Sequence, residues 1–225
     1  MSKKFNIAVL GATGAVGQEM MHLLQERSFP VNTLTPLASA RSAGKEIAFC
    51  GEPIKIKEAS ANAFAGFDIV LGAVGSGLSR ELAPVIKASG ALYIDNSSAF
   101  RMHDDVPLVV PEINPEDAKK HNGIIANPNC STIITVVAVN PINKLSPIKS
   151  MTVSTYQAVS GAGAAGPIEL REQIKAIVEG REIAANVFQY QIAENLIPHI
   201  GSFLDNDYTD EEMKMQNEGR KIMHL

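Results

Sequence analysis

The sequence has few of the features that mark a disulfide-rich, membrane-embedded or nucleic-acid-binding protein. It contains only two cysteines, so a disulfide framework is not indicated and each thiol is free to do chemistry. No apolar stretch reaches membrane-spanning length without interruption, and the N-terminus resembles neither a signal peptide nor a transit peptide. The net charge of -4 leaves no basic stripe for a phosphate backbone. We therefore expect a cytoplasmic globular protein that acts on small molecules, without a metal site and without nucleic-acid or membrane partners.

Apolar runs and helical patterns alternate through the first half of the chain. The runs that suit strands are residues 5–10, 31–37, 68–74, 91–95, 108–111 and 123–126. Helical faces separate several of them, as in Met20, Leu23 and Leu24. This alternation predicts an α/β fold with a doubly wound, Rossmann-type parallel sheet. Residues 47–57 interrupt the rhythm with a predicted β-hairpin.

The second half of the chain does not continue the alternation of apolar runs and helical patterns. Residues 131–139 are rich in β-branched side chains and suit a strand as well as a buried helix, and periodicity does not decide between them. Pro167, at a good first helical position, and Gly180, as a stop, predict a helix. Thr209 and Glu212 form a capping box, which predicts another helix near the end of the sequence.

Gly11, Gly14 and Gly17 directly follow the first predicted strand and precede a helix. Glycines at this place let the backbone close on a pyrophosphate, while the helix N-terminus offers free N–H groups and a positive dipole end. The spacing alone also fits a tight strand-to-helix turn, but its placement favours a dinucleotide site. The predicted cofactor contacts of this loop are Gly11, Thr13, Gly14, Ala15, Val16 and Gly17.

The loop after the second predicted strand carries no acid. An Asp or Glu there would bind a free ribose 2′-hydroxyl, as in NAD-binding domains. Residues 38–45 instead place the guanidinium of Arg41 between the hydroxyls of Ser39 and Ser42. Such a cluster suits a 2′-phosphate and favours NADP over NAD. The alternative is a solvated loop with one ordinary arginine.

Cys130 follows a rigid Asn-Pro-Asn turn and opens a long apolar run. If that run is a helix, its N-terminal dipole favours the reactive thiolate, and its first N–H groups are suited to hold an oxyanion. The competing interpretation is a small buried hydrophobe, which is common for cysteine and fits Cys50 in the predicted hairpin. For Cys130 the composition alone leaves both interpretations open.

Further motifs occur in order along the whole chain. They are residues 11–17 and 38–45, Asp-Asn-Ser-Ser-Ala-Phe-Arg at 95–101, Val-Val-Pro-Glu-Ile-Asn at 109–114, Asn-Pro-Asn-Cys-Ser-Thr-Ile at 127–133, Tyr-Gln-Ala-Val-Ser-Gly-Ala-Gly at 156–163 and Glu-Glu-Met-Lys at 211–214. Together they resemble the aspartate-semialdehyde dehydrogenase family. The related N-acetyl-glutamyl-phosphate reductases share the chemistry, but the residues around Cys130 and Gln157 favour the aspartate family.

The resemblance implies an NADP-dependent enzyme that reversibly reduces aspartyl phosphate to aspartate semialdehyde and phosphate, in the biosynthesis of lysine, threonine and methionine. In that direction Cys130 attacks the acyl phosphate, and NADPH delivers hydride to the resulting thioester. The resemblance also implies an NADP-binding domain over residues 1–129 and a catalytic and dimerisation domain of α+β type over residues 130–225. A homodimer is expected for the full-length protein.

Other site residues of the family carry over by position. Gln157 would be the polar residue beside the nucleophile, and Arg101 and Lys214 would contact phosphate. Glu211 would face the substrate amino group, and Asn129 would be a substrate neighbour of the thiol. Without the resemblance these are ordinary features: a surface arginine, an exposed ion pair, and polar residues of a strand and a turn. The contacts expected at the nicotinamide end of the cofactor are Asn96, Ser160 and Gly161.

Members of the family continue past the position of Leu225, and their additional part carries a general-base His and an Arg that binds the substrate carboxylate. None of the five histidines here matches that base. We therefore expect residues 1–225 alone to be a C-terminally truncated and inactive fragment with unpaired strand edges. Two hypotheses remain: an enzyme seen in part or completed by another chain, and a non-catalytic NADP-binding or interaction remnant.

Overall fold

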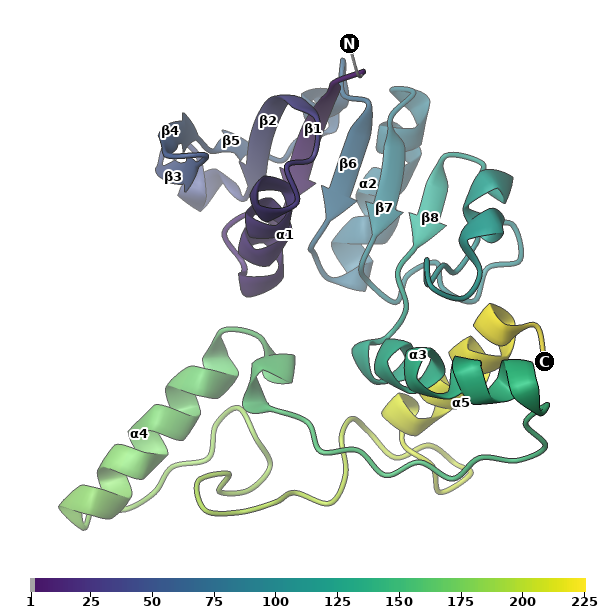
Figure 1. Ribbon diagram of the computed structural model, residues 1–225. Coiled ribbons are helices and arrows are strands. Elements are labelled where there is room, and N and C mark those ends of the chain that lie inside the picture. Colours follow the sequence, from purple (N-terminus) through teal and green to yellow (C-terminus); the bar gives the residue numbers. More distant parts are fainter. Residues whose placement is uncertain (1–2) are drawn as a thin grey trace. The chain divides into compact units, whose positions relative to one another are not determined.

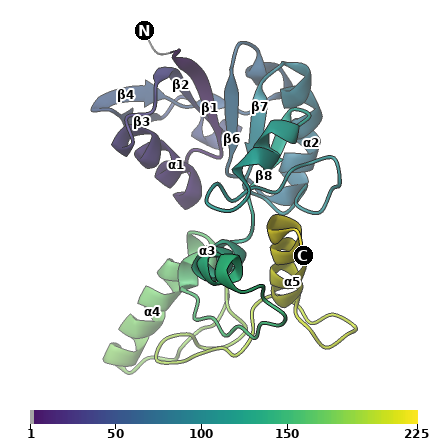
Figure 2. The same cartoon turned by 45° about the vertical axis from the view of Figure 1, so that its right-hand side comes forward.

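The structure is a computed structural model that describes residues 3–225. Within it the chain forms two compact units, and Figures 1 and 2 draw it from two directions. The first unit comprises the residues up to Lys149 together with Met215–Leu225, and the second comprises Ser150–Lys214. The domain boundary predicted between residues 129 and 130 stays a prediction.

A six-stranded parallel sheet forms the centre of the first unit (Figure 1). Its strands in spatial order are β5 (Lys57–Glu58), β2 (Val31–Ala38), β1 (Phe5–Leu10), β6 (Ile69–Gly72), β7 (Leu92–Asp95) and β8 (Ile124–Ala126). The chain moves from β1 to its neighbour β2, and later returns to the other side of β1 as β6. The predicted doubly wound sheet is confirmed, and its order reverses at β1. The predicted run 108–111 contributes only a bridge between Leu108 and Ala126.

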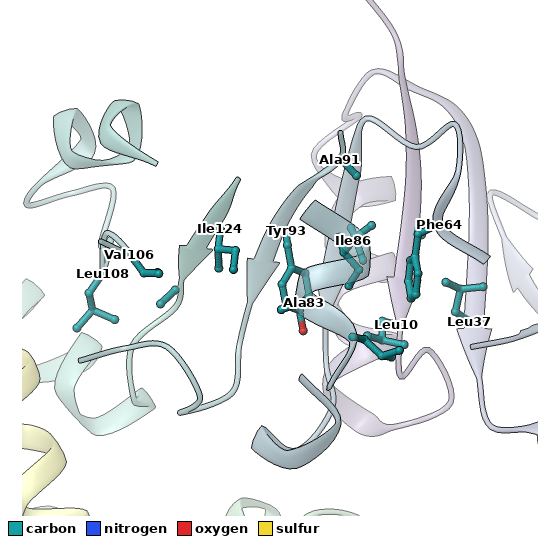
Figure 3. Packing of buried hydrophobic residues seen from close by; sticks show 14 of the residues in the cluster. Leu10, Leu37, Phe64, Ala83, Ile86, Ala91, Tyr93, Val106, Leu108 and Ile124 are labelled. Atoms are coloured by element: carbon teal, nitrogen blue, oxygen red, sulfur yellow. The ribbon is translucent and has the colours of Figure 1, made fainter. Parts of the chain in front are cut away.

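Helices cover both faces of this sheet. The helices and 3-10 turns before residue 146 are α1 (Ala15–Glu26), η1 (Ala40–Ser42), η2 (Ala61–Phe64), α2 (Ser76–Ala88), η3 (Pro115–Lys120) and α3 (Cys130–Leu145). Successive side chains of a strand point to opposite faces. Ala8 and Leu10 of β1 therefore join a core cluster with Leu82 of α2, whereas Val9 packs with Met21 of α1. Figure 3 shows the packing of the first of these clusters.

A two-stranded antiparallel hairpin confirms the insertion predicted at residues 47–57. It consists of β3 (Glu46–Phe49) and β4 (Glu52–Lys55), with Ile47 opposite Ile54. Cys50 and Gly51 form its turn, with φ of 51° and 83°. Phe49 packs against the cluster of Val9, so the hairpin extends the face that α1 covers.

Two helices carry residues of the candidate site. The β-branched run is helical, as α3, which resolves the alternative of strand or helix. α5 (Asp210–Met223) opens with the predicted capping box: the N–H of Thr209 donates to the Glu212 carboxylate at 2.7 Å, and the N–H of Glu212 donates to the Thr209 hydroxyl at 3.2 Å. From Met215 onward α5 belongs to the first unit, where Ile222 is fully buried.

The second unit is built around α4 (Ala165–Glu179), which follows the 3-10 turn η4 (Val159–Ala162). α4 begins two residues before Pro167, so the prediction of Pro167 as its first residue is wrong. It ends at Gly180, whose φ of 63° is the left-handed conformation that favours glycine. Within residues 150–214 no hydrogen-bonded strand forms beyond a bridge between Phe203 and Thr209. The strands expected of an α+β domain are therefore not seen in this unit.

Candidate active site

Most of the predicted cofactor residues and the nucleophile lie in loops at one edge of the sheet. Residues 11–17 follow β1, residues 39–42 follow β2, Asn96 follows β7, and residues 127–130 follow β8. Because the strands are parallel, their carboxyl ends meet at the same edge, where α/β sheets bind their ligands. Figure 1 shows the arrowheads of β1, β6, β7 and β8 pointing to this side. The first unit therefore brings the glycine loop and Cys130 to a common edge.

The glycine loop has the shape of a dinucleotide site. Gly11 has a φ of 85°, and a Cβ on it would overlap the carbonyl oxygen of Ala73. A Cβ on Gly17 would overlap the carbonyl oxygen of Gly11. α1 has no acidic residue in its first turn, so its first N–H groups and dipole are not offset by a side-chain charge. The loop residues exposed to solvent are Thr13, Gly14, Ala15 and Val16.

The residues predicted to hold a 2′-phosphate follow β2. Ser39 precedes the turn η1, and both Ser39 and Arg41 are exposed, while Ser42 is partly buried. The pairing of β2 with β5 also places Glu58 next to Ala38. This acidic neighbour comes from a separate strand, which the spacing along the sequence does not reveal. The roles of Ser39, Arg41 and Ser42 in binding a 2′-phosphate stay predictions.

Hydrogen bonds fix the loop after β7. The buried carboxylate of Asp95 accepts from the N–H of Ser97 at 3.1 Å and from its hydroxyl at 2.7 Å. The N–H of Asn96 donates to the carbonyl oxygen of Gly72 at 3.0 Å, and its side-chain oxygen accepts from the amide of Asn127 at 2.5 Å. The side chain predicted to contact nicotinamide thus joins the loop after β7 to the turn that precedes the nucleophile.

Arg101, the predicted phosphate ligand, is a buried arginine with 8% of its surface exposed. Its Nη1 donates to the carboxylate of Glu218 at 3.0 Å, and its Nη2 donates to the carbonyl oxygen of Asn96 at 3.0 Å. Its Nε is buried and has no hydrogen-bond partner within residues 3–225. The alternative of a surface arginine is therefore wrong, and the guanidinium keeps donor capacity for an anion.

Glu218 is a site residue that the sequence motifs did not identify. It lies on α5, is 1% exposed, and accepts the N–H of Asn129 at 2.7 Å through Oε2. One turn later Lys221 donates to the carbonyl oxygen of Arg101 at 2.9 Å and to two more carbonyls of the same loop. Burial lowers the pKa of Lys221. In the sequence, Glu218 and Lys221 stand out only by their spacing of three residues, which places them on one face of a helix. This spacing does not reveal which part of the protein that face contacts.

Cys130 is the first residue of α3 and is exposed, so the alternative of a buried hydrophobe is wrong. Its Sγ lies 4.0 Å from the hydroxyl of Ser131. Asn129, predicted as a substrate neighbour, is the N-cap: its side-chain oxygen accepts from the N–H groups of Ser131 at 2.9 Å and Thr132 at 3.3 Å. These two N–H groups are therefore already bonded, which removes them from the predicted oxyanion role.

Limiting iodoacetamide is expected to alkylate Cys130 before Cys50. Both thiols are exposed, but Cys130 lies on the first turn of α3, where reactive cysteines commonly lie, whereas Cys50 lies in a hairpin turn. Peptide mapping after a short reaction at neutral pH measures both extents. Cys50→Ser is the control and should leave the labelling rate of Cys130 unchanged. Faster labelling of Cys50 would contradict the choice of nucleophile.

Three of the predicted site residues in the second unit lie before α4. Gln157 belongs to an exposed segment without regular structure, and its Nε2 lies 3.3 Å from the hydroxyl of Thr155. Ser160 and Gly161 lie in η4 and are exposed as well. All three are accessible to solvent in this unit, and their roles stay predictions.

Glu211 and Lys214 lie at the start of α5. The Nζ of Lys214 donates to Asp210 at 2.7 Å and to Glu211 at 3.3 Å. Burial lowers the pKa of Lys214, but the hydrogen bond to Asp210 and the charge of Glu211 outweigh this and raise it. Lys214 is therefore a persistent cation, as a phosphate contact requires.

The histidines of the chain have neighbours other than the nucleophile. His22 pairs with Glu26, His103 packs on Phe100, His121 accepts from the N–H of Gly123, His199 contacts Gln189, and His224 pairs with Asp117.

Among residues 3–225 no group of three or more His, Cys, Asp or Glu side chains is arranged to hold a metal ion. In the same residues, no helix is both long enough and apolar enough to cross a membrane.

Comparison with known families matches both halves of the chain. Residues 6–121 match the family described as semialdehyde dehydrogenase, NAD binding domain, and residues 139–225 match semialdehyde dehydrogenase, dimerisation domain. The boundary predicted between residues 129 and 130 falls in the interval between these two matches. Both halves thus point to one enzyme family.

Similar proteins are aspartate-semialdehyde dehydrogenases. That of Bacillus subtilis is 50% identical over 100% of this chain and 67% of its own length. That of Aquifex aeolicus is 52% identical over 98% of this chain and 66% of its own length. The chain therefore spans about two thirds of the length of the curated relatives it matches.

Solved structures agree with these relatives. The crystal structure of aspartate semialdehyde dehydrogenase II from Vibrio cholerae has a TM-score of 0.96 and 47% identity, and the match covers 99% of this chain and 67% of that one. A second structure of the Vibrio cholerae enzyme, with 46% identity and a TM-score of 0.96, is described as complexed with ASA. The predicted family and fold are confirmed: the chain belongs to the aspartate-semialdehyde dehydrogenase family of oxidoreductases and carries its NAD binding domain.

Proposed function

We propose that this protein catalyses the reversible, NADP-dependent reduction of aspartyl phosphate to aspartate semialdehyde and phosphate, a step in the biosynthesis of lysine, threonine and methionine. The observation that carries this proposal is the exposed thiol of Cys130 on the first turn of α3, at the sheet edge that also holds the glycine loop. A thiolate suits both halves of the reaction, because it is a strong nucleophile and its thioester accepts hydride more readily than an ordinary ester.

The covalent half of the reaction uses residues of the first unit. The Sγ of Cys130 attacks the acyl carbon, so that a C–S bond forms while the C–O bond to phosphate breaks and phosphate leaves with the electron pair. Arg101 is proposed to bind the phosphate group, because its guanidinium is held by Glu218 and Asn96 while its Nε keeps an unused donor. Asn129 caps α3 and so fixes the position of the thiol.

The cofactor site fits a dinucleotide. Gly11 and Gly17 leave no room for a Cβ, so only glycines give the loop this close packing, and residues 13–16 are exposed for contact with a pyrophosphate. When bound, the nicotinamide supplies or accepts the hydride of the reaction. Asn96 is proposed to lie near the nicotinamide, since its loop is bonded to the turn before Cys130.

The residues of the second unit are assigned by their match to the family motifs. Gln157 is proposed as the polar residue beside the nucleophile, Lys214 as the second phosphate contact, and Glu211 as the partner of the substrate amino group. Lys214 supplies a cation, as phosphate binding requires, and it is paired with Asp210 and Glu211 in this structure. Ser160 and Gly161 are proposed to contact the cofactor.

Absorbance spectroscopy of the full-length gene product tests the proposed reaction in the reverse direction. Aspartate semialdehyde and NADP are expected to yield NADPH only when inorganic phosphate is present, because phosphate must release the acyl group from Cys130. NADPH formation at the same steady rate without phosphate would contradict the proposal, since it would indicate hydrolysis and not phosphorolysis.

NADP is expected to bind more tightly than NAD, and Arg41→Ala is expected to weaken NADP binding about 10-fold while changing NAD binding little. This factor corresponds to about 1.4 kcal/mol, near the lower end of the roughly 1.5–3 kcal/mol that a hydrogen bond to a charged group contributes. Calorimetric titration of both cofactors measures it. Glu58→Gln is the matched control and should tighten NADP binding, because Glu58 is the acidic neighbour at this strand end. Equal affinity of the unmodified protein for the two cofactors would contradict the assignment.

We also propose a homodimer with a cytoplasmic location. Residues 139–225 match the dimerisation domain of the family. α3 exposes Ile134 and Ile142, and α4 exposes Val178, with 71%, 62% and 81% of their surfaces accessible. These exposed apolar side chains are available for burial against a second subunit. Light scattering of the full-length gene product should give twice the mass of one chain.

A further inference from the structure

We propose that Glu218 is a positioning residue that couples the phosphate-binding Arg101 to the turn that carries the nucleophile; this rests on the function proposed above. The carboxylate of Glu218 is buried and makes two hydrogen bonds at once. Oε1 accepts from Nη1 of Arg101 at 3.0 Å, and Oε2 accepts from the backbone N–H of Asn129 at 2.7 Å. Asn129 caps α3 and directly precedes Cys130, so a single carboxylate is bonded to both halves of the covalent step.

Arg101 is also held from a second side. Its Nη2 donates to the carbonyl oxygen of Asn96, and the Asn96 side chain accepts from Asn127 in the turn before the nucleophile. A planar guanidinium that is fixed at both terminal nitrogens has one orientation. Its buried Nε lacks a partner within residues 3–225, and an anion that accepts from it would satisfy this donor.

The helix that carries Glu218 is fastened to the backbone of the same loop. Lys221, one turn after Glu218, donates to the carbonyl oxygens of Arg101 at 2.9 Å, His103 at 2.6 Å and Val106 at 2.9 Å. α3 and α5 lie side by side in Figures 1 and 2, and Gly219 faces Val136 of α3. The last turns of α5 therefore hold both the side chain and the main chain of Arg101.

The chemistry of the two contacts explains why this position carries a carboxylate. Both neighbours of Glu218 are donors, and a carboxylate accepts from both. A glutamine amide would turn its NH₂ group towards one of them and lose that hydrogen bond. An aspartate keeps the charge but is shorter by one methylene, so it does not span both contacts. Glu218→Gln and Glu218→Asp therefore separate the charge of this side chain from its reach.

The test measures how well inorganic phosphate protects Cys130 from iodoacetamide in the full-length gene product. The phosphate concentration that halves the alkylation rate is expected to rise about 10-fold in both Glu218→Gln and Glu218→Asp, because each loses a charge-assisted contact that orients Arg101. Glu172→Gln is the matched control: it removes an exposed carboxylate from α4 and should leave this concentration unchanged. Thermal unfolding shows that each variant is folded at the assay temperature.

Two outcomes would overturn the inference alone. If Glu218→Gln lowered the phosphate concentration that halves the alkylation rate, the carboxylate would merely offset the charge of Arg101. An unchanged concentration in folded variants would show that Glu218 contributes only to stability. If Glu218→Gln does not fold, Glu218→Asp decides by the same criterion. Absence of phosphate protection in the unmodified protein would instead contradict the proposed function, and the inference with it.

Discussion

Replacement of Cys130 by serine is expected to lower the rate of phosphate-dependent NADPH formation by about 10⁴-fold or more. Removal of the nucleophile in covalent catalysis has an effect of this order, because no acyl-enzyme forms and only binding contributions remain. Cys130 is an exposed thiol at the N-terminus of α3, and a serine there keeps the size of the side chain without the reactive thiolate. Initial rates of the full-length gene product measure the effect.

Cys50→Ser is the control for this experiment, since it removes the other exposed thiol, in the hairpin turn, and should leave the rate unchanged. Cofactor-dependent thermal protection should be the same in both variants, which shows that they fold and bind NADP. A Cys130→Ser variant that keeps more than a tenth of the activity would rule out the thioester mechanism.

A polypeptide that consists of residues 1–225 alone is expected to bind NADP and to react at Cys130, yet to turn over at least about 10²-fold more slowly than the longer relatives. Loss of a general base has an effect of roughly 10²- to 10⁴-fold, and loss of a group that orients the substrate adds to it. The chain spans about two thirds of the relatives' length, and the contacts described for its five histidines do not include Cys130.

The comparison needs matched assays. Residues 1–225 and the full-length relative from Bacillus subtilis would be assayed with the same substrate, phosphate and cofactor concentrations. Thermal protection by NADP shows that the shorter polypeptide is folded. Turnover within tenfold of the relative's rate would show that a residue within this chain serves as the base.

The parallel sheet and the glycine loop follow from short stretches of sequence. β1 begins and ends at the predicted residues, and the glycines directly after it have a packing role at Gly11 and Gly17. The hairpin with Cys50 in its turn and the capping box at Thr209 were predicted for the same reason. In each of these features, the residues that determine the structure lie close together in the sequence.

Periodicity did not determine whether the run after Cys130 is a strand or a helix. Its β-branched residues suit a strand, yet the run is the helix α3. Asn129 caps its N-terminus and Val136 is buried in the core. Tertiary packing and a side-chain cap together outweigh the weak preference of β-branched residues for strands.

The environment of Arg101 was not predictable from local patterns. Its ion pair with Glu218 joins residues separated by 117 positions, and the bond from Asn129 to the same carboxylate spans 89. Contacts of this kind depend on how α5 packs against the loops of the sheet. The strands expected in the second unit depend on such contacts too, because a strand needs a partner, and within residues 150–214 the pairing is limited to the bridge between Phe203 and Thr209.

Mass spectrometry of the Cys130 peptide tests the covalent mechanism most directly. The full-length gene product is mixed with aspartate semialdehyde and NADP in the absence of phosphate, so that the aldehyde is oxidised on the thiol and the acyl group is not released. We expect the mass of one aspartyl group to be added to the peptide with Cys130 and not to the peptide with Cys50, and to disappear when phosphate is added. An unmodified Cys130 in a preparation that forms NADPH at its normal rate once phosphate is present would contradict the mechanism.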